Sequence, residues 1–152
     1  MSTKRIFLLP GDVRFAQAPG WLYTILGSCL AITAWHPYKK HGGMCHFQLP
    51  NSSKKAELNG RYGRDAFSLL CQQMSKYASQ PSEYRYQIYG GSQILKLQPS
   101  VSIGARNIQA AKQLLTNAAL AIDFEDTGGH QSRKIELDLS TGQVWVQRLN
   151  RE

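Results

Sequence analysis

Residues 24–50 read TILGSCLAITAWHPYKKHGGMCHFQLP, and this stretch decides the fold that the sequence predicts. Two runs within it, residues 30–35 and 44–49, are rich in apolar, β-branched and aromatic residues. The connector between them is rich in turn formers and ends in Gly42 and Gly43. Two such runs on either side of a turn are typical of antiparallel neighbours in a sheet. We therefore expect a pair of strands that meet across this connector.

The rest of the chain predicts further strands and two helices. Apolar residues recur at helical spacing over residues 61–78 and 105–119, which predicts two amphipathic helices. Strands are expected at residues 5–9, 84–89, 120–124, 134–139 and 143–149, the last two as a closing hairpin. The predicted fold is α/β of the mixed α+β kind, with a central mixed, largely antiparallel sheet flanked by two main helices.

Length and composition indicate one globular domain. The chain has 152 residues, of which 42% are hydrophobic and 18% charged, and it contains no internal repeat or linker. We therefore expect residues 1–152 to form a single domain. The apolar run at residues 6–9 is too short for a signal peptide, and no stretch approaches the roughly 18 apolar residues of a membrane span. These observations favour a soluble, cytoplasmic protein with no membrane insertion.

The net charge favours acidic partners. Eighteen Lys and Arg residues against ten Asp and Glu residues give a formal charge of +8 at pH 7. A positive surface attracts acidic molecules, whether nucleic acid or an acidic protein. The basic residues are scattered singly or in pairs, and no run interleaves them with aromatic residues, so nucleic-acid binding is not expected.

The three cysteines, Cys29, Cys45 and Cys71, show no disulfide spacing, which favours free thiols in a reducing compartment. No metal site or other cofactor is expected, because no C-x-x-C or H-x-x-x-H pair supplies ligands. Cys45 directly precedes His46, and consecutive strand residues point to opposite faces. If His46 faces a site, Cys45 is therefore expected to be a structural thiol on the other face.

Cys29 and His46 form a candidate nucleophile and base. A thiol attacks as the thiolate, and a nearby imidazole is its usual activator. Of the four histidines, only His46 lies within a predicted strand, next to the strand that begins after Cys29. Pairing Trp35 with Gly43 would set His46 opposite Ile32, three positions beyond Cys29, which is about 10 Å along a strand.

The turn before Cys29 also fits a catalytic interpretation. Gly27 and Ser28 have small side chains, so backbone N–H groups near Cys29 could point at a developing oxyanion. The alternative is that Cys29 is a small buried hydrophobic residue after a turn, which is the usual environment of a free cysteine. The residue pattern alone leaves both interpretations open.

Several short motifs occur in a fixed order along nearly the whole chain. They are LGSC (26–29), GGMCHFQLP (42–50), RYG (61–63), GGS (90–92), IGARN (103–107), DTGG (126–129) and TGQVWVQRL (141–149). In content and order these motifs resemble the bacterial CheD family of chemoreceptor glutamine deamidases.

The resemblance implies a protein-glutamine glutaminase, a cysteine hydrolase that converts receptor glutamines to glutamate plus ammonia through a thioester intermediate. By this resemblance Cys29 matches the nucleophile and His46 the general base and acid. The family's third catalytic member is a threonine a few residues upstream of the cysteine. Thr24 is the candidate for that role here, and Tyr23 is the other residue that could occupy the aligned position.

The resemblance also implies partners. They are the cytoplasmic domains of methyl-accepting chemoreceptors and, in organisms that have one, the CheC phosphatase. An alternative function is a non-catalytic regulatory module that binds the receptors or the phosphatase without turnover. Deamidation of a receptor fragment would discriminate between the two.

Overall fold

The computed structural model describes residues 3–52, 54–93 and 102–149. In chain order the strands are β1 Lys4–Phe7, β2 Val13–Gln17, β3 Gly20–Leu26, β4 Leu30–His36, β5 His41–Phe47, β6 Arg85–Gly90, β7 Ile122–Thr127, β8 Arg133–Asp138 and β9 Val144–Arg148. The helices are α1 Gly63–Lys76, the short 3-10 helix η1 Pro81–Glu83, and α2 Ile103–Asn117.

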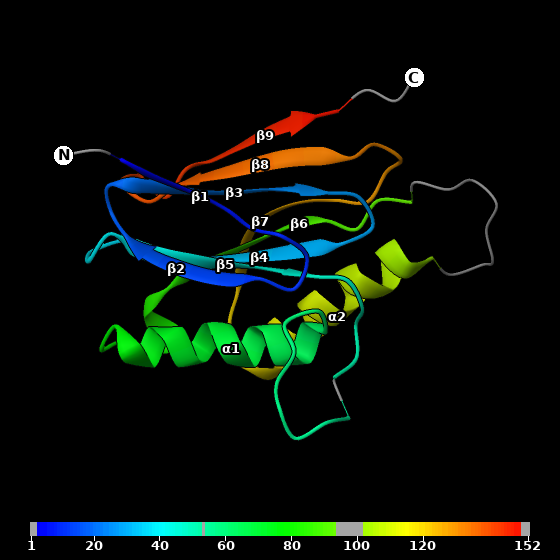
Figure 1. Cartoon of the computed structure of the whole chain (residues 1–152), viewed down its shortest axis with the longest axis horizontal. Coiled ribbons are helices and arrows are strands. Elements are labelled where there is room, and N and C mark those ends of the chain that lie inside the picture. Colours follow the sequence, from blue (N-terminus) through cyan, green and yellow to red (C-terminus); the bar gives the residue numbers. More distant parts are fainter. Residues whose placement is uncertain (1–2, 53, 94–101, 150–152) are drawn as a thin grey trace.

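These elements stack in three layers (Figure 1). A four-stranded sheet in the order β1-β3-β8-β9 lies against one face of a five-stranded sheet in the order β2-β5-β4-β6-β7, and α1 and α2 cover the other face. Neighbouring strands are antiparallel except for the parallel pairs β1 with β3 and β6 with β7. The expected mixed fold, largely antiparallel with two flanking helices, is confirmed. The division of the strands between two sheets goes beyond the expectation.

Most of the expected elements are present. Both helices, the β4 and β5 pair and the closing hairpin of β8 and β9 form close to their predicted positions. Two strands, β2 and β3, were not predicted from the sequence, although β3 carries part of the candidate site. No helix in the described ranges is long and apolar enough to cross a membrane.

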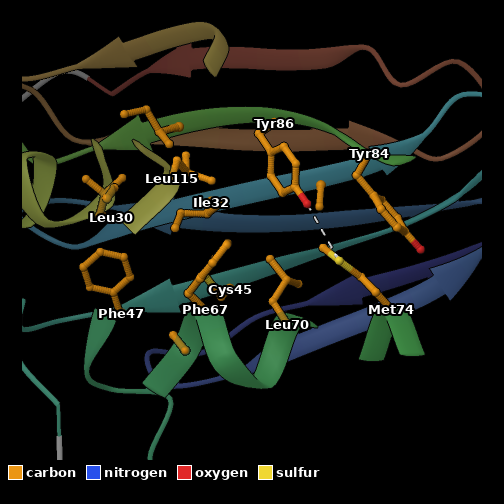
Figure 2. Close-up of a cluster of buried hydrophobic side chains, with 14 residues drawn as sticks. Leu30, Ile32, Cys45, Phe47, Phe67, Leu70, Met74, Tyr84, Tyr86 and Leu115 are labelled. Carbon is orange, nitrogen blue, oxygen red and sulfur yellow. Dashed lines mark hydrogen bonds between the residues drawn. The ribbon is translucent and has the colours of Figure 1, made fainter. Parts of the chain in front are cut away.

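The five-stranded sheet is buried on both faces because each face covers a hydrophobic core. On the helix side, Ile32 and Cys45 point towards Leu70 and its neighbours on α1 (Figure 2). On the other side, Ala31 and Met44 pack against the four-stranded sheet. Successive side chains of β4 and β5 therefore face the two cores in turn, because side chains alternate between the faces of a strand.

The predicted register between β4 and β5 was wrong by one residue. Trp35 pairs with Gly42 rather than Gly43, and His46 pairs with Ala31 rather than Ile32. The prediction treated both glycines as part of the turn, but the turn ends at Lys40 and the glycines belong to β5.

Strand β5 requires glycine at these two positions because neighbouring atoms occupy the space of a side chain. A Cβ atom on Gly43 would lie 2.2 Å from the Phe15 ring, and one on Gly42 would lie 2.5 Å from the Ala34 carbonyl. The shift has a large consequence, since a one-residue slip moves a side chain to the opposite face of a sheet. His46 therefore shares the inter-sheet face with Ala31 instead of the helix-covered face with Ile32.

Candidate active site

Cys29 lies in the turn where the chain passes from one sheet to the other. The turn follows β3 of the four-stranded sheet and leads directly into β4 of the five-stranded sheet. The thiol is free and half-buried, and it packs against the core between the two sheets. The site is thus built where both sheets and the turn between them meet.

His46 and Thr24 bring the two sheets into direct contact beside this turn. His46 lies on β5 and is 2% exposed, and Thr24 lies on β3 and is fully buried. The Thr24 Oγ1 atom is 2.8 Å from His46 Nδ1, and the Thr24 hydroxyl donates to the Leu8 carbonyl at 2.7 Å. The structure therefore brings together two of the three residues expected from the sequence resemblance.

This pair fixes the protonation pattern of the ring. A hydroxyl has one hydrogen, and Thr24 donates it to the Leu8 carbonyl, so Thr24 can only accept from His46. The proton of the neutral imidazole then sits on Nδ1, and Nε2 carries the lone pair. His46 Nε2 is buried and has no hydrogen-bond partner in the described part of the chain. It is the nitrogen that remains available as a base.

The alternative position, Tyr23, faces the other way. Its ring lies on the outer face of the four-stranded sheet, under the charged groups of Arg5 and Lys134. Consecutive residues of β3 point to opposite faces, so Thr24 faces inwards to His46 and Tyr23 does not.

The observed register sets His46 opposite a residue that is one position nearer to Cys29 than the predicted register did. His46 pairs with Ala31, and Cys29 lies two residues before Ala31 on the same inter-sheet side. Among the described residues, no hydrogen bond joins the Cys29 thiol to the ring, and catalytic hydrogen bonds often tighten only when substrate binds.

Burial keeps both groups neutral. Burial lowers the pKa of His46 to about 4, and the nearby Asp12 carboxylate opposes this shift. Burial also raises the pKa of the Cys29 thiol above its ordinary value. At neutral pH the free protein therefore holds a thiol and an imidazole, rather than a thiolate and an imidazolium.

The backbone around Cys29 is fixed through its carbonyl groups. The carbonyls of Gly27, Ser28 and Cys29 accept hydrogen bonds from Ser92 N at 2.9 Å, Asn107 Nδ2 at 3.0 Å and Gly91 N at 2.8 Å, respectively. Within the described residues, the amide N–H groups of Ser28 and Cys29 donate to no partner. Such amides can stabilise negative charge that develops on a bound carbonyl oxygen.

Cys45, His36 and His41 lie away from the Cys29 turn. Cys45 is completely buried on the helix side of the five-stranded sheet, which confirms that it faces away from His46. His36 and His41 lie at the far end of β4 and β5, where they contact Glu83 and Tyr84. No group of three metal-ligating side chains occurs in the ranges that the structure describes.

Sequence reasoning missed two residues that hold the site. Asn107 and Ser92 contact the Cys29 turn, but neither was given a role, although both lie within the quoted motifs IGARN and GGS. The sequence signal for such a role was the position of both residues in these motifs. Their contacts depend on how α2 and the end of β6 pack, which the residue pattern does not specify.

The geometry is that of a candidate cysteine hydrolase. A free thiol and an imidazole with an available lone pair lie on one side of a strand pair, next to amide groups that are not otherwise engaged. The arrangement can in principle deprotonate the thiol, stabilise an oxyanion and return the proton to a leaving group.

Comparison with known proteins gives the family. The family model CheD, chemotactic sensory transduction, matches residues 48–148. The "Probable chemoreceptor glutamine deamidase CheD 3" of Dechloromonas aromatica is 37% identical over 145 residues, which cover 93% of this chain and 85% of that protein. This chain belongs to the CheD family, as its sequence motifs predicted.

Two further relatives extend the likeness to other bacteria. The "Probable chemoreceptor glutamine deamidase CheD" of Pseudomonas fluorescens is 37% identical over 151 residues, 96% of this chain and 85% of its own length. "Probable chemoreceptor glutamine deamidase CheD 1" of Leptospira interrogans is 32% identical over 155 residues, 94% of this chain and 92% of its own. Cys29 and His46 precede the segment that the family model matches.

Proposed function

We propose that this protein is a chemoreceptor glutamine deamidase, a protein-glutamine glutaminase that hydrolyses the side-chain amide of receptor glutamines. Membership of the CheD family and the names of its relatives support the substrate and the reaction. The observation that carries the chemistry is the Thr24–His46 contact, because it leaves the His46 lone pair on the face of the sheet that Cys29 shares.

In the first half of the proposed reaction, His46 Nε2 takes the proton of the Cys29 thiol as the sulfur attacks the amide carbon. The amides of Ser28 and Cys29 stabilise the oxyanion, since they have no other partner among the described residues. The imidazolium then gives its proton to the departing nitrogen, and the carbon–nitrogen bond breaks to release ammonia. The product on the enzyme is a thioester at Cys29.

In the second half, water takes the place of the thiol. Neutral His46 removes a proton from the water as it attacks the thioester, and the imidazolium returns that proton to the Cys29 sulfur. The receptor leaves with glutamate in place of glutamine, and the enzyme returns to its starting state. Thr24 acts through the ring, because its hydroxyl holds Nδ1 protonated throughout.

The partners follow from the proposed reaction. The cytoplasmic domains of methyl-accepting chemoreceptors are the substrates, which would place the enzyme in the cytoplasm. Where an organism has a CheC phosphatase, we include it as a second partner on the strength of the family resemblance. The formal charge of +8 supports an acidic protein partner, because it favours encounter with a negative surface.

Mass spectrometry on a receptor cytoplasmic fragment tests the proposal. Each deamidation adds about 1 mass unit, because –NH2 becomes –OH. We expect the shift with the unmodified protein and with Cys71→Ala, a matched change at a half-buried thiol of α1. We expect none with Cys29→Ala. A shift that survives Cys29→Ala would exclude this thiol, and receptor binding without any shift would favour the non-catalytic module.

A further inference from the structure

Asn107 of α2 joins the two chain segments that carry the candidate catalytic pair. Its side-chain amide nitrogen Nδ2 donates to the Ser28 carbonyl at 3.0 Å and to the Gln48 carbonyl at 2.9 Å. Ser28 directly precedes Cys29, and Gln48 lies two residues after His46. The Asn107 residue is completely buried. One side chain therefore contacts the backbone on both sides of the site.

The contact lies where the strand pairing stops. The last paired residues of β4 and β5 are Leu30 and Phe47, so Cys29 and Gln48 would form the next pair. They do not pair in this way, because the Cys29 carbonyl accepts from Gly91 and the Gln48 amide donates to the Arg61 carbonyl. Asn107 spans this position and supplies the connection between the two segments that the sheet no longer provides.

The chemistry of the amide suits this task. An asparagine side chain has two N–H hydrogens, one for each carbonyl, and the opposite orientation would set Oδ1 against both carbonyl oxygens. The other buried residues on this face of α2 are Gly104, Ala111 and Leu115, which carry no polar side chain. Asn107 Oδ1 has no partner among the described residues, so this buried amide makes its hydrogen bonds through Nδ2 alone.

The helix that carries Asn107 is itself anchored next to the site. A Cβ atom on Gly104 would lie 2.4 Å from the Gly91 carbonyl oxygen and 2.5 Å from that of Ser92. This close approach seats the first turn of α2 directly against residues 91–92. The same two residues hold the carbonyls of Cys29 and Gly27. The donor of the two bridging hydrogen bonds thus has a fixed position relative to the turn.

We propose that Asn107 is a positioning residue that sets the separation of the Cys29 sulfur and the His46 ring. This inference rests on the proposed function for its kinetic test. Removing the bridge frees the turn and the end of β5 to move apart, and a displacement of about 1 Å can cost on the order of a hundredfold in rate. The effect belongs in kcat rather than in KM, since the Asn107 side chain is fully buried and does not itself face a bound substrate.

The kinetic test compares Asn107→Ala and Asn107→Asp with two controls on the same helix. Asn107→Asp keeps the size of the side chain but, when ionised, donates no hydrogen bond. Leu115→Ala removes core packing about two helical turns beyond Asn107, and Gln113→Ala removes an exposed amide that donates to Asn117. With rates expressed per folded molecule, we expect kcat to fall about tenfold or more in both Asn107 variants, with KM within about twofold. Both controls should keep kcat, although Leu115→Ala should lower the thermal midpoint.

A second readout needs no receptor. Cys71→Ala is the background, so that alkylation by iodoacetamide, followed by peptide mass spectrometry, reports on Cys29 rather than on the other half-buried thiol. We expect each Asn107 change to slow alkylation of Cys29 at neutral pH towards the rate of His46→Ala. The inference would be overturned if the folded Asn107 variants had the same alkylation rate and the same kcat as the unmodified protein. If the unmodified protein does not deamidate receptor, the proposed function fails while the alkylation comparison still decides the role of Asn107.

Discussion

Thr24 determines which nitrogen of His46 carries the proton. Its single hydroxyl hydrogen goes to the Leu8 carbonyl, so the ring nitrogen facing it must be the donor. The residue is completely buried, and water has no access to replace this contact. A side chain of the same shape without the hydroxyl would leave both the carbonyl and the ring nitrogen without their partner.

Thr24→Val is expected to reduce kcat for receptor deamidation by about 10²-fold, because the base is no longer held in the useful tautomer. Thr24→Ser retains the hydroxyl and should keep most of the rate. The measurement is steady-state release of ammonia, with thermal unfolding to confirm that each variant folds. Full activity in Thr24→Val would mean that the hydroxyl does not orient the base.

The pH dependence of kcat/KM follows from the two buried groups. The proposed reaction uses neutral His46 as the base, and its pKa of about 4 means that the acid limb should lie near that pH rather than near the ordinary 6.5. Burial raises the pKa of Cys29, so the alkaline limb should lie above the ordinary value of 9.0. A broad plateau through neutral pH is the expected profile. An acid limb near pH 6.5 would show that His46 is not the buried base described here.

At the scale of elements, the β4 and β5 pair sets the geometry of the site, and its close packing depends on glycine. Gly43 lies in β5 beside β2, where the Phe15 ring occupies the space that a side chain would need. The same glycine was expected in a turn, and the turn interpretation produced the incorrect register. A glycine that is required for close packing cannot be distinguished in a sequence from a glycine that is required for a turn.

Gly43→Ala is expected to lower the free energy of unfolding by about 1–3 kcal/mol, because the new Cβ overlaps the Phe15 ring and must displace it. The measurement is chemical denaturation. Gly20→Ala, also in a strand, is the control, since the nearest atom to its Cβ would be 3.3 Å away and a smaller loss should follow. Equal losses in both variants would contradict the packing explanation.

The sequence predicted the elements that turn one side towards a single hydrophobic core, because their apolar residues then recur with a clear period. The two helices and the closing hairpin have one apolar face each, and they form close to their expected places. β3 escaped prediction because its outward residues Trp21, Tyr23 and Ile25 are as apolar as its inward ones, which removes the alternating pattern. Cys29 and His46 could be proposed from residue type and predicted neighbourhood. Asn107 could not, because its role depends on the docking of α2.

At the scale of the whole molecule, the site depends on how the two sheets are held together. Thr24 and His46 make one connection between the sheets, and the fully buried Arg133 of β8 makes another. Its guanidinium donates to Asp126 of β7, to the Gly128 carbonyl and to Ser92, whose amide holds the turn before Cys29. The buried Arg133 side chain thus links the junction of the two sheets to the turn before Cys29.

Asp126→Ala is expected to destabilise the protein by about 3–5 kcal/mol, because it leaves the buried Arg133 charge without its carboxylate. Glu136→Ala, which removes the carboxylate that pairs with Arg5 and Lys134 at the surface, should cost no more than about 1 kcal/mol. Urea denaturation of both variants checks the comparison. Similar losses in the two would show that burial of Arg133 adds nothing to the sheet junction.

Cys29 becomes the acyl carrier in the proposed reaction, and trapping the covalent intermediate shows which residue holds the acyl group. A receptor fragment that contains a target glutamine is mixed with the enzyme, the reaction is quenched in acid within the first turnover, and the attachment site is located by tandem mass spectrometry. We expect a receptor-derived thioester on Cys29 that is absent from His46→Ala. Turnover with the acyl group on another residue, or with Cys29 replaced by alanine, would contradict this expectation.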